Sequence, residues 1–218
     1  ARACAAVHAA GAGAARQGRR ARTERAVTAV QPLWQPAYIG IGSNLSNPRA
    51  QVLGALDRIA RIEGVCLVRR SGLYGSPPLG PADQPDYVNA VAGVLTLLAP
   101  QALLAELQSL ERAAGRPQNH ERWGPRALDL DLLVYGRERS SDPALTLPHP
   151  GIVERSFVLY PLADVAPDLD VPGMGRVADL KRRVSDGSIR LLDTEAAAGS
   201  EAAAGAGAPQ HTGTVRTA

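Results

Sequence analysis

The strand that decides the fold reads ALDLDLLVY over residues 127–135. Successive side chains of a β-strand point to opposite faces of a sheet. The leucines at alternate positions therefore face one core layer, while Asp129 and Asp131 share the other face. We expect a strand that packs against a hydrophobic core on one side and presents two carboxylates on the other.

Helices and strands alternate on the N-terminal side of this strand. Leucines recur at helical spacing after Pro100 up to Gly115, and Asn47 followed by Pro48 supplies an N-cap and a first-turn proline for an earlier helix. The other segments expected to be strands are 37–41, 65–73 and 87–98. This order predicts an α+β fold, a ferredoxin-like sandwich in which helices pack on a mixed or antiparallel sheet.

Composition divides the chain into one domain and two tails. Residues 1–36 are an Ala/Arg-rich extension, in which six arginines and one acidic residue precede position 27. Residues 194–218 are rich in Ala, Gly and Thr. We expect both tails to be disordered, although an Arg-rich, acid-poor N-terminus is also typical of a targeting segment. Residues 37–193 are expected to form the single folded domain.

Charge and composition exclude several classes of protein. The net charge of +3 arises from the N-terminal extension, so no nucleic-acid partner is expected. Two cysteines are too few for a disulfide framework or a zinc site. No apolar run reaches the ~18–20 residues that cross a bilayer. We expect a cytoplasmic monomer that acts on small molecules and has no membrane partner.

Asp129 and Asp131 are candidate ligands for Mg²⁺. Their Cα atoms should lie ~6.5–7 Å apart, given a rise of ~3.3 Å per residue. Two carboxylates on one face repel each other unless a cation lies beside them, and Mg²⁺ completes its oxygen shell with water and phosphate. Taken alone, an Asp-x-Asp pair more often marks a solvent-facing polar stripe, so the neighbouring loop decides the interpretation.

That loop carries Arg116, Arg122 and Arg126 just before the strand. Guanidinium groups match phosphate oxygens, and phosphoryl transfer depends on positioning and on neutralising charge. Trp123 lies among these arginines and offers an indole that a planar ligand would cover. The pattern favours metal-assisted phosphoryl transfer, and a solvated basic loop of another enzyme is the alternative.

The usual glycine-rich nucleotide motifs are missing. No Gly-x-x-x-x-Gly-Lys-Ser/Thr pattern occurs in the sequence, which disfavours a P-loop kinase. Residues 40–44, GIGSN, follow a strand and precede a helix, but they lack the third glycine of a dinucleotide fingerprint. This segment therefore predicts a tight turn.

Taken together, the motifs resemble the 6-hydroxymethyl-7,8-dihydropterin pyrophosphokinase family of folate biosynthesis. The resemblance runs from Ala37 to about Asp168 and rests on YIGIGSNL (38–45), SPPLGP (76–81), QPDYVN (84–89), RWGPR (122–126), LDLD (128–131), PHP (148–150) and RSFVL (155–159). It implies that ATP and the pterin alcohol give AMP and the pterin diphosphate, by attack of the substrate hydroxyl on the β-phosphorus.

The resemblance also implies roles for individual residues. Asp129 and Asp131 would hold two Mg²⁺ ions, and the catalytic residues would be Asp129, Asp131, Arg116 and Arg126. Tyr87 and Phe157 would stack on the pterin and Asn89 would read its edge, in a site that comprises Ser76, Pro77, Leu79, Tyr87, Asn89, Trp123 and Phe157. The ATP site would comprise Gln108, Glu111, Trp123, Arg126, Thr146, His149 and Arg155. One departure is Gln118, which is neutral where the family often carries a second basic residue.

Two functions of other classes remain open at this point. A non-catalytic pterin- or nucleotide-binding module would not need the Asp129/Asp131 pair. A different Mg²⁺-dependent nucleotidyl or phosphoryl transferase would not need Tyr87, Asn89 and Phe157 at pterin-site positions. For the pyrophosphokinase interpretation, loops 76–85 and 116–126 flank the site and are expected to close and exclude water from ATP.

Overall fold

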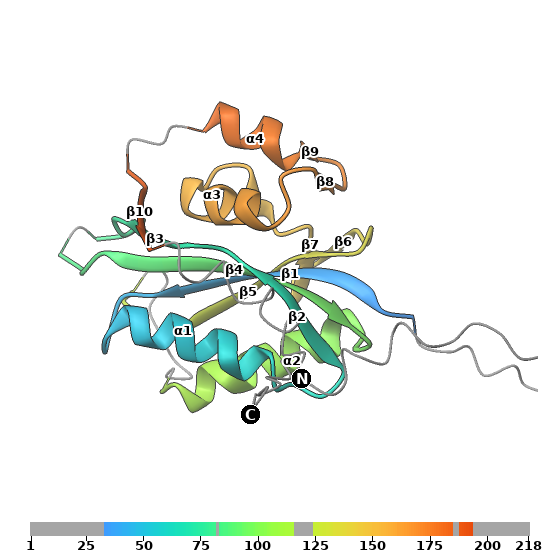
Figure 1. Cartoon of the computed structure of the whole chain (residues 1–218), viewed down its shortest axis with the longest axis horizontal. Coiled ribbons are helices and arrows are strands. Elements are labelled where there is room, and N and C mark those ends of the chain that lie inside the picture. Colours follow the sequence, from blue (N-terminus) through green and yellow to red (C-terminus); the bar gives the residue numbers. More distant parts are fainter. Residues whose placement is uncertain (1–32, 82, 116–123, 185–187, 194–218) are drawn as a thin grey trace, which may run out of the picture.

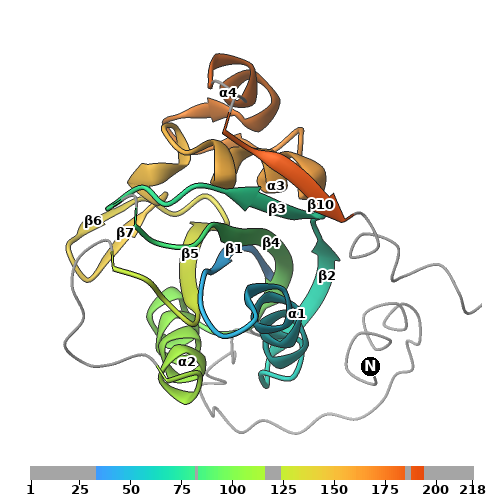
Figure 2. The same cartoon turned by 90° about the vertical axis from the view of Figure 1, so that its left-hand side faces the viewer.

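The fold has three layers in the computed structural model, which describes residues 33–81, 83–115, 124–184 and 188–193. A twisted sheet lies in the middle. Helices α1 and α2 cover one face, and helices α3 and α4 lie on the other side (Figures 1 and 2). The two faces have separate hydrophobic cores, and the site described below lies on the α3 side.

The main sheet is antiparallel at every strand pairing among the described residues. Its strand order is β10-β3-β4-β1-β5, and β2 also pairs with β4. The strands are β1 (Gln35–Ser43), β2 (Val65–Arg70), β3 (Leu73–Ser76), β4 (Tyr87–Thr96), β5 (Asp129–Tyr135) and β10 (Arg190–Asp193). The order β5-β1-β4-β2, with two helices on one face, is ferredoxin-like, which confirms the predicted fold class.

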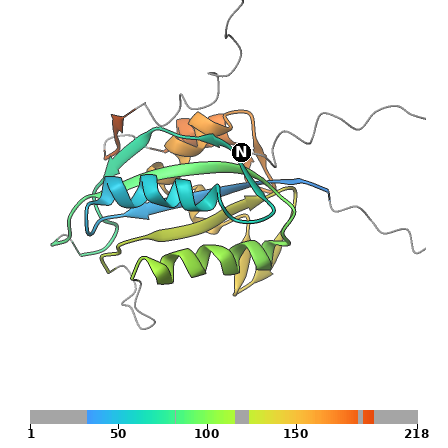
Figure 3. The same ribbon diagram turned by 60° about the horizontal axis from the view of Figure 1, so that its bottom comes forward.

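The first helical layer forms as its sequence periodicity predicts. Helix α1 (Pro48–Ile59) begins at the expected cap, because the Ala50 N–H donates to Asn47 Oδ1 at 3.4 Å. Helix α2 (Pro100–Ala113) starts with Pro100 at its first turn. Figure 3 shows the cyan α1 and the green α2 crossing the same face of the sheet. Their apolar side chains pack against the inward-facing residues of β1, β4 and β5 in one buried cluster.

Two expected strand boundaries differ in the structure. The segment 65–73 is not one strand, because the chain leaves the ladder at Ser71, where the Val91 N–H donates to Ser71 Oγ at 2.9 Å instead of to a backbone carbonyl. Strand β1 begins at Gln35, two residues before the expected start. Neither difference moves a residue of the site to the other face.

The second helical layer is formed by the chain that follows β5, a region for which the sequence patterns predicted no helix or strand. It contains a 3₁₀ turn η2 (Pro150–Ile152), helices α3 (Ser156–Val165) and α4 (Val177–Arg183), and two small hairpins. The hairpins are β6 (Ser140–Asp142) with β7 (Leu145–Leu147), and β8 (Asp170–Val171) with β9 (Gly175–Arg176). Leu159 and Leu162 of α3 pack on Val91 and Leu133 of the sheet. None of the helices described here is long and apolar enough to span a bilayer.

Candidate active site

The strand register opens a gap above the two carboxylates. Asp129 and Asp131 of β5 lie on the α3 side of the sheet, and they pair across to Gly42 and Gly40 of β1. A Cβ atom on Gly42 would lie 3.4 Å from Asn89 Oδ1 and 4.0 Å from Asp129 Cβ. A larger residue at position 42 would therefore fill the space between Asn89 and the carboxylates.

A cavity of about 300 Å³ occupies this gap and extends between β4, β5 and α3. It brings together most of the described residues that the sequence assigned to a site. Those lining it are Ser76, Pro77, Leu79, Tyr87, Asn89, Arg126, Asp129, Asp131, His149, Arg155 and Phe157. Residues separated by as many as 81 positions thus meet in one site of a size suited to a small ligand.

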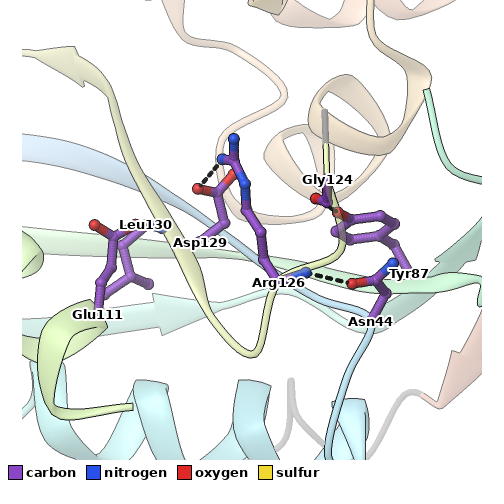
Figure 4. Close-up of polar contacts among 7 residues, drawn as sticks. All are labelled: Asn44, Tyr87, Glu111, Gly124, Arg126, Asp129 and Leu130. Carbon is purple, nitrogen blue, oxygen red and sulfur yellow. Dashed lines mark hydrogen bonds and ion pairs between the residues drawn. The ribbon is translucent and has the colours of Figure 1, made fainter. Parts of the chain in front are cut away.

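The electrostatics at one end of the cavity favour a bound cation. Burial, and then the neighbouring charge of Asp129, raise the pKa of Asp131 above its ordinary value, while His149, Arg155 and Arg126 oppose that shift. Arg126 Nη1 forms an ion pair with Asp129 Oδ1 at 2.5 Å (Figure 4). Burial also lowers the pKa of His149, although the charge of Asp131 opposes this. A positive charge beside Asp131 would stabilise its charged form and offset the free-energy cost of its burial.

The donor set at this end fits Mg²⁺ better than a metal that requires a full protein cage. No group of three or more His, Cys, Asp and Glu side chains is arranged to hold a metal among the residues that the structure describes. Two carboxylates on one strand face offer only hard oxygen donors. Mg²⁺ commonly takes one or two carboxylates and fills its remaining positions with water and phosphate oxygens.

The other end of the cavity is suited to a flat, polar heterocycle. Tyr87 from β4 and Phe157 from α3 both line it. Asn89 also lines the cavity, is 5% exposed and donates from Nδ2 to Ser76 Oγ at 3.0 Å. Its Oδ1 is directed to the open space above Gly42. Aromatic side chains beside a fixed amide bind planar ring systems and discriminate between their edges.

His149 and Arg155 border the cavity near β5. The His149 N–H donates to Leu133 O at 2.8 Å, which holds the residue against the strand. Its Nδ1 accepts from the Gly151 N–H at 3.1 Å, so a neutral ring carries its proton on Nε2. The Arg155 guanidinium lies 5.9 Å from the Phe157 ring centroid. These two side chains add a hydrogen-bond donor and a fixed positive charge next to the carboxylates.

Gly151 determines where Arg155 lies. A Cβ atom on Gly151 would stand 2.7 Å from both Nε and Cζ of Arg155. Because the family resemblance implies that Arg155 contacts ATP, we expect Gly151→Ala to displace the guanidinium and to weaken ATP binding about tenfold, a loss of about 1.4 kcal/mol. The fold should persist because the clashing atoms belong to a flexible side chain. Titration calorimetry with a non-hydrolysable ATP analogue measures the affinity.

The matched control for this change is Gly54→Ala in α1, on the opposite face of the sheet. A Cβ atom there meets nothing closer than an Arg58 nitrogen at 3.8 Å. An alanine inside a helix is expected to stabilise the protein by up to ~1 kcal/mol and to leave ATP affinity unchanged. Unaltered ATP affinity in Gly151→Ala would contradict the positioning of Arg155 by this glycine.

Several residues assigned to the site do not line the cavity. Gln108 and Thr146 are exposed on α2 and β7, and Thr146 Oγ1 donates to Asp142 O at 3.1 Å. Glu111 is 3% exposed on the α2 side of the sheet, where its Oε1 accepts from the Leu130 N–H at 2.8 Å (Figure 4). This carboxylate fixes β5 between the two aspartates. Arg116, Gln118, Arg122 and Trp123 lie outside the described residues, so their assigned roles stay predictions.

The sequence patterns missed the residues that shape the site without reacting. Gly40 and Gly42 were assigned no role in the site, and the tight turn predicted for residues 40–44 is wrong, because β1 continues to Ser43 and both glycines line the cavity. The available signal was that these two glycines are two positions apart and therefore share one face of β1, as Asp129 and Asp131 share one face of the neighbouring strand. It becomes informative only once the register between the two strands is known.

Comparison with known proteins gives a consistent result. The family model for 7,8-dihydro-6-hydroxymethylpterin-pyrophosphokinase matches residues 38–167. Two relatives are both named 2-amino-4-hydroxy-6-hydroxymethyldihydropteridine pyrophosphokinase. The one from Pseudomonas aeruginosa is 51% identical over 138 residues, covering 63% of this chain and 85% of the relative. The one from Haemophilus influenzae is 46% identical over 157 residues, covering 72% and 98%.

Solved structures support the same fold. A Plasmodium falciparum HPPK-DHPS chain superposes with a TM-score of 0.57 at 13% identity, covering 73% of this chain. The match spans 46% of that solved chain, slightly less than half of its length. At this identity the likeness concerns the fold alone, whereas the family model and the closer relatives cover most of the region that builds the cavity. The chain belongs to the 7,8-dihydro-6-hydroxymethylpterin-pyrophosphokinase family.

Proposed function

We propose that this chain transfers pyrophosphate from ATP to 6-hydroxymethyl-7,8-dihydropterin in folate biosynthesis, with Asp129 and Asp131 as its Mg²⁺ ligands. The single observation that carries the proposal is one cavity lined by two chemically different sets of side chains. One set is the carboxylate pair with Arg126, and the other includes Tyr87 and Asn89. Family membership supports the reaction itself, and ATP is the co-substrate of the family.

The reaction joins the two ends of the cavity. The pterin hydroxyl oxygen forms a bond to the β-phosphorus of ATP, and the bond from that phosphorus to the α–β bridging oxygen breaks. The hydroxyl proton passes to a base, for which Asp131 is the candidate, and from there to solvent, and AMP departs with the bridging oxygen. Most of the rate enhancement is expected to come from holding the bound pterin and nucleotide in this geometry. Phosphoryl transfer depends mainly on positioning and on charge neutralisation.

The pterin is proposed to lie between Tyr87 and Phe157, with its hydrogen-bonding edge against Asn89. The Asn89 amide is held in one orientation because Nδ2 donates to Ser76 Oγ and the cavity-facing atom is Oδ1. A fixed acceptor at the ring edge selects a ligand that presents an N–H there. Ser76, Pro77 and Leu79 complete this end of the cavity.

The phosphates are proposed to bind where Arg126, Arg155 and His149 surround the carboxylates. Two Mg²⁺ ions held by Asp129 and Asp131 would neutralise phosphate charge and acidify the attacking hydroxyl. Arg126 holds Asp129 in place, and the phosphates of ATP offer its guanidinium a second anionic partner. The assignments of Gln108, Glu111, Thr146, Arg116 and Trp123 to the nucleotide or pterin are part of the same proposal.

The organisation of the enzyme is proposed on the same grounds. We propose that the enzyme is a monomer that acts on small molecules. We place its catalytic domain at residues 37–193 and the enzyme in the cytoplasm.

Incubation of the protein with Mg²⁺, ATP and hydroxymethyldihydropterin is expected to give AMP and the pterin diphosphate in equal amounts. Nucleotide chromatography and phosphorus NMR measure both products. Release of ADP would indicate an ordinary kinase and would contradict the proposal. Binding of both ligands without any nucleotide product would indicate a binding module. Omission of the pterin is the control, because AMP formation requires the acceptor hydroxyl.

A further inference from the structure

Asn44 is a buried residue that the catalytic site does not account for. It follows β1 in the segment GIGSN, lies 2% exposed and is not among the residues lining the cavity. Its side chain nevertheless has hydrogen-bond partners from two loops that both border the cavity. Buried amides are costly unless all their polar atoms are paired, so this arrangement requires a structural or functional reason.

One arm of Asn44 holds the backbone of Arg126. The Arg126 N–H donates to Asn44 Oδ1 at 2.7 Å, and the Asn44 N–H donates back to Arg126 O at 3.0 Å. Figure 4 shows the first of these bonds beside the Arg126–Asp129 ion pair. Two bonds to one residue fix both its position and its orientation. The guanidinium therefore starts from a fixed point when it reaches Asp129 or a phosphate.

The other arm of Asn44 holds the loop that leads into β4. Its Nδ2 donates to Gln84 Oε1 at 3.3 Å and to Pro85 O at 3.2 Å. This loop follows β3, includes the cavity residues Pro77 and Leu79, and ends directly before Tyr87, the first residue of β4. A second link closes the ring, because Tyr87 Oη donates to Gly124 O at 3.2 Å (Figure 4).

A single amide thus links Arg126, a proposed phosphate ligand, to the loop that precedes the proposed pterin contact Tyr87. Its oxygen accepts from Arg126 and its Nδ2 donates to Gln84 and Pro85, so the two segments cannot shift independently without breaking one of these hydrogen bonds. We propose that Asn44 is a positioning residue that couples the two substrate subsites, so that either substrate, by fixing the position of the loop it contacts, raises the affinity for the other. This inference rests on the proposed function.

The coupling must be reciprocal. If ATP raises pterin affinity by a given factor, pterin raises ATP affinity by the same factor, and couplings of this kind typically amount to about 5- to 150-fold. Loss of Asn44 is expected to move this factor towards one. A residue that only stabilised the fold would lower the melting temperature and would leave the factor intact.

The chain offers variants that separate the two arms. Asn44→Ala removes both. Asn44→Asp keeps an oxygen for the Arg126 N–H but removes the donors to Gln84 and Pro85. Gln84→Ala weakens only the loop arm, at a half-buried position where the fold is expected to tolerate the change. Ser43→Ala is the matched control, because Ser43 is fully buried and its Oγ donates to Ala127 O at 2.6 Å, but no bond joins it to residues 84 or 85.

The experiment measures pterin affinity by calorimetry, with and without saturating Mg²⁺ and α,β-methylene ATP, alongside melting curves. Asn44→Asp should lose about tenfold or more of the coupling factor while the affinity for the nucleotide alone stays within about threefold. Gln84→Ala should lose part of the coupling. Ser43→Ala should melt at a lower temperature and keep the wild-type factor. In steady state, Asn44→Asp should raise the KM for pterin more than it lowers kcat.

Three results would overturn the coupling role. The first is a wild-type coupling factor in both Asn44→Asp and Gln84→Ala. The second is a loss of coupling in Ser43→Ala that matches its loss of stability, since this would indicate a general structural effect. The third is independent binding of the two ligands to the wild-type protein, and AMP formation would then still support the proposed function. A wild-type protein that forms no AMP would instead refute the function, without reference to any variant.

Discussion

Asp131→Asn is expected to lower kcat/KM by about 10³-fold and, in the same protein, to raise the melting temperature measured without ligands. The loss of activity follows from the position of Asp131 beside Asp129 in the cavity, where a neutral amide is a poorer ligand for Mg²⁺ and cannot assist deprotonation of the acceptor. The side chain keeps its shape, so the substitution tests charge rather than packing.

The gain in stability follows from the direction of the pKa shift. Burial and the charge of Asp129 raise the pKa of Asp131 in the folded protein above its ordinary value. For a carboxyl with a raised pKa, the folded state is relatively more stable below the unfolded pKa and loses that advantage as pH rises through the folded pKa. At neutral pH the charged form therefore opposes folding, and asparagine removes this penalty. A rise of a few degrees is expected.

Melting curves in EDTA and with Mg²⁺ plus a non-hydrolysable ATP analogue check both effects. The wild type should gain stability from the added ligands, and Asp131→Asn should gain much less. Asp129→Asn is the matched control, because that carboxylate pairs with Arg126 at 2.5 Å and its loss should reduce activity without raising the melting temperature. A lower melting temperature for Asp131→Asn, or retained activity, would contradict the assignment.

Sequence alone was sufficient where a local pattern decides the structure. The alternation at residues 128–132 correctly separated the leucines of one core from the carboxylates of the other face. The Asn47 cap and the apolar spacing of α1 and α2 likewise depend on residues within a few positions of each other. These features predicted the ferredoxin-like half of the fold and the two carboxylates of the site.

The second layer could not be predicted in this way, because its elements are short or interrupted. Pro161 lies inside α3, where a proline usually argues against a helix, and α4 has only seven residues. Strand β10 has four residues and pairs with β3, which precedes it by more than a hundred positions. The partners that stabilise these elements are distant in sequence, so no local pattern indicated them.

The same limit applies to the site. The Asp-x-Asp motif was visible, but the glycines above it acquire a role only through the pairing of β1 with β5. Asn44 has hydrogen-bond partners 40, 41 and 82 positions away. Its neighbours in sequence suggested a turn, and only the folded chain relates it to both substrate ends of the cavity.

Arg126→Ala is expected to lower kcat/KM by about 10²- to 10³-fold, the range found when one preorganised donor to a developing charge is removed. Arg126 borders the cavity beside both aspartates, and its guanidinium has two anionic partners in the proposed reaction, Asp129 and the phosphates of ATP. Arg126→Lys should recover only part of the loss, because an ammonium keeps the charge but not the planar fork that matches two oxygens.

The expected loss belongs to the nucleotide end of the cavity. The backbone bonds of residue 126 to Asn44 do not depend on its side chain, so the loop should keep its position in both variants. Steady-state kinetics should therefore show a higher KM for ATP and a lower kcat, while calorimetry finds pterin affinity nearly unchanged in the absence of nucleotide. An equal loss of pterin affinity would mean that the side chain maintains the whole cavity, and activity within about threefold of wild type would exclude Arg126 from charge neutralisation.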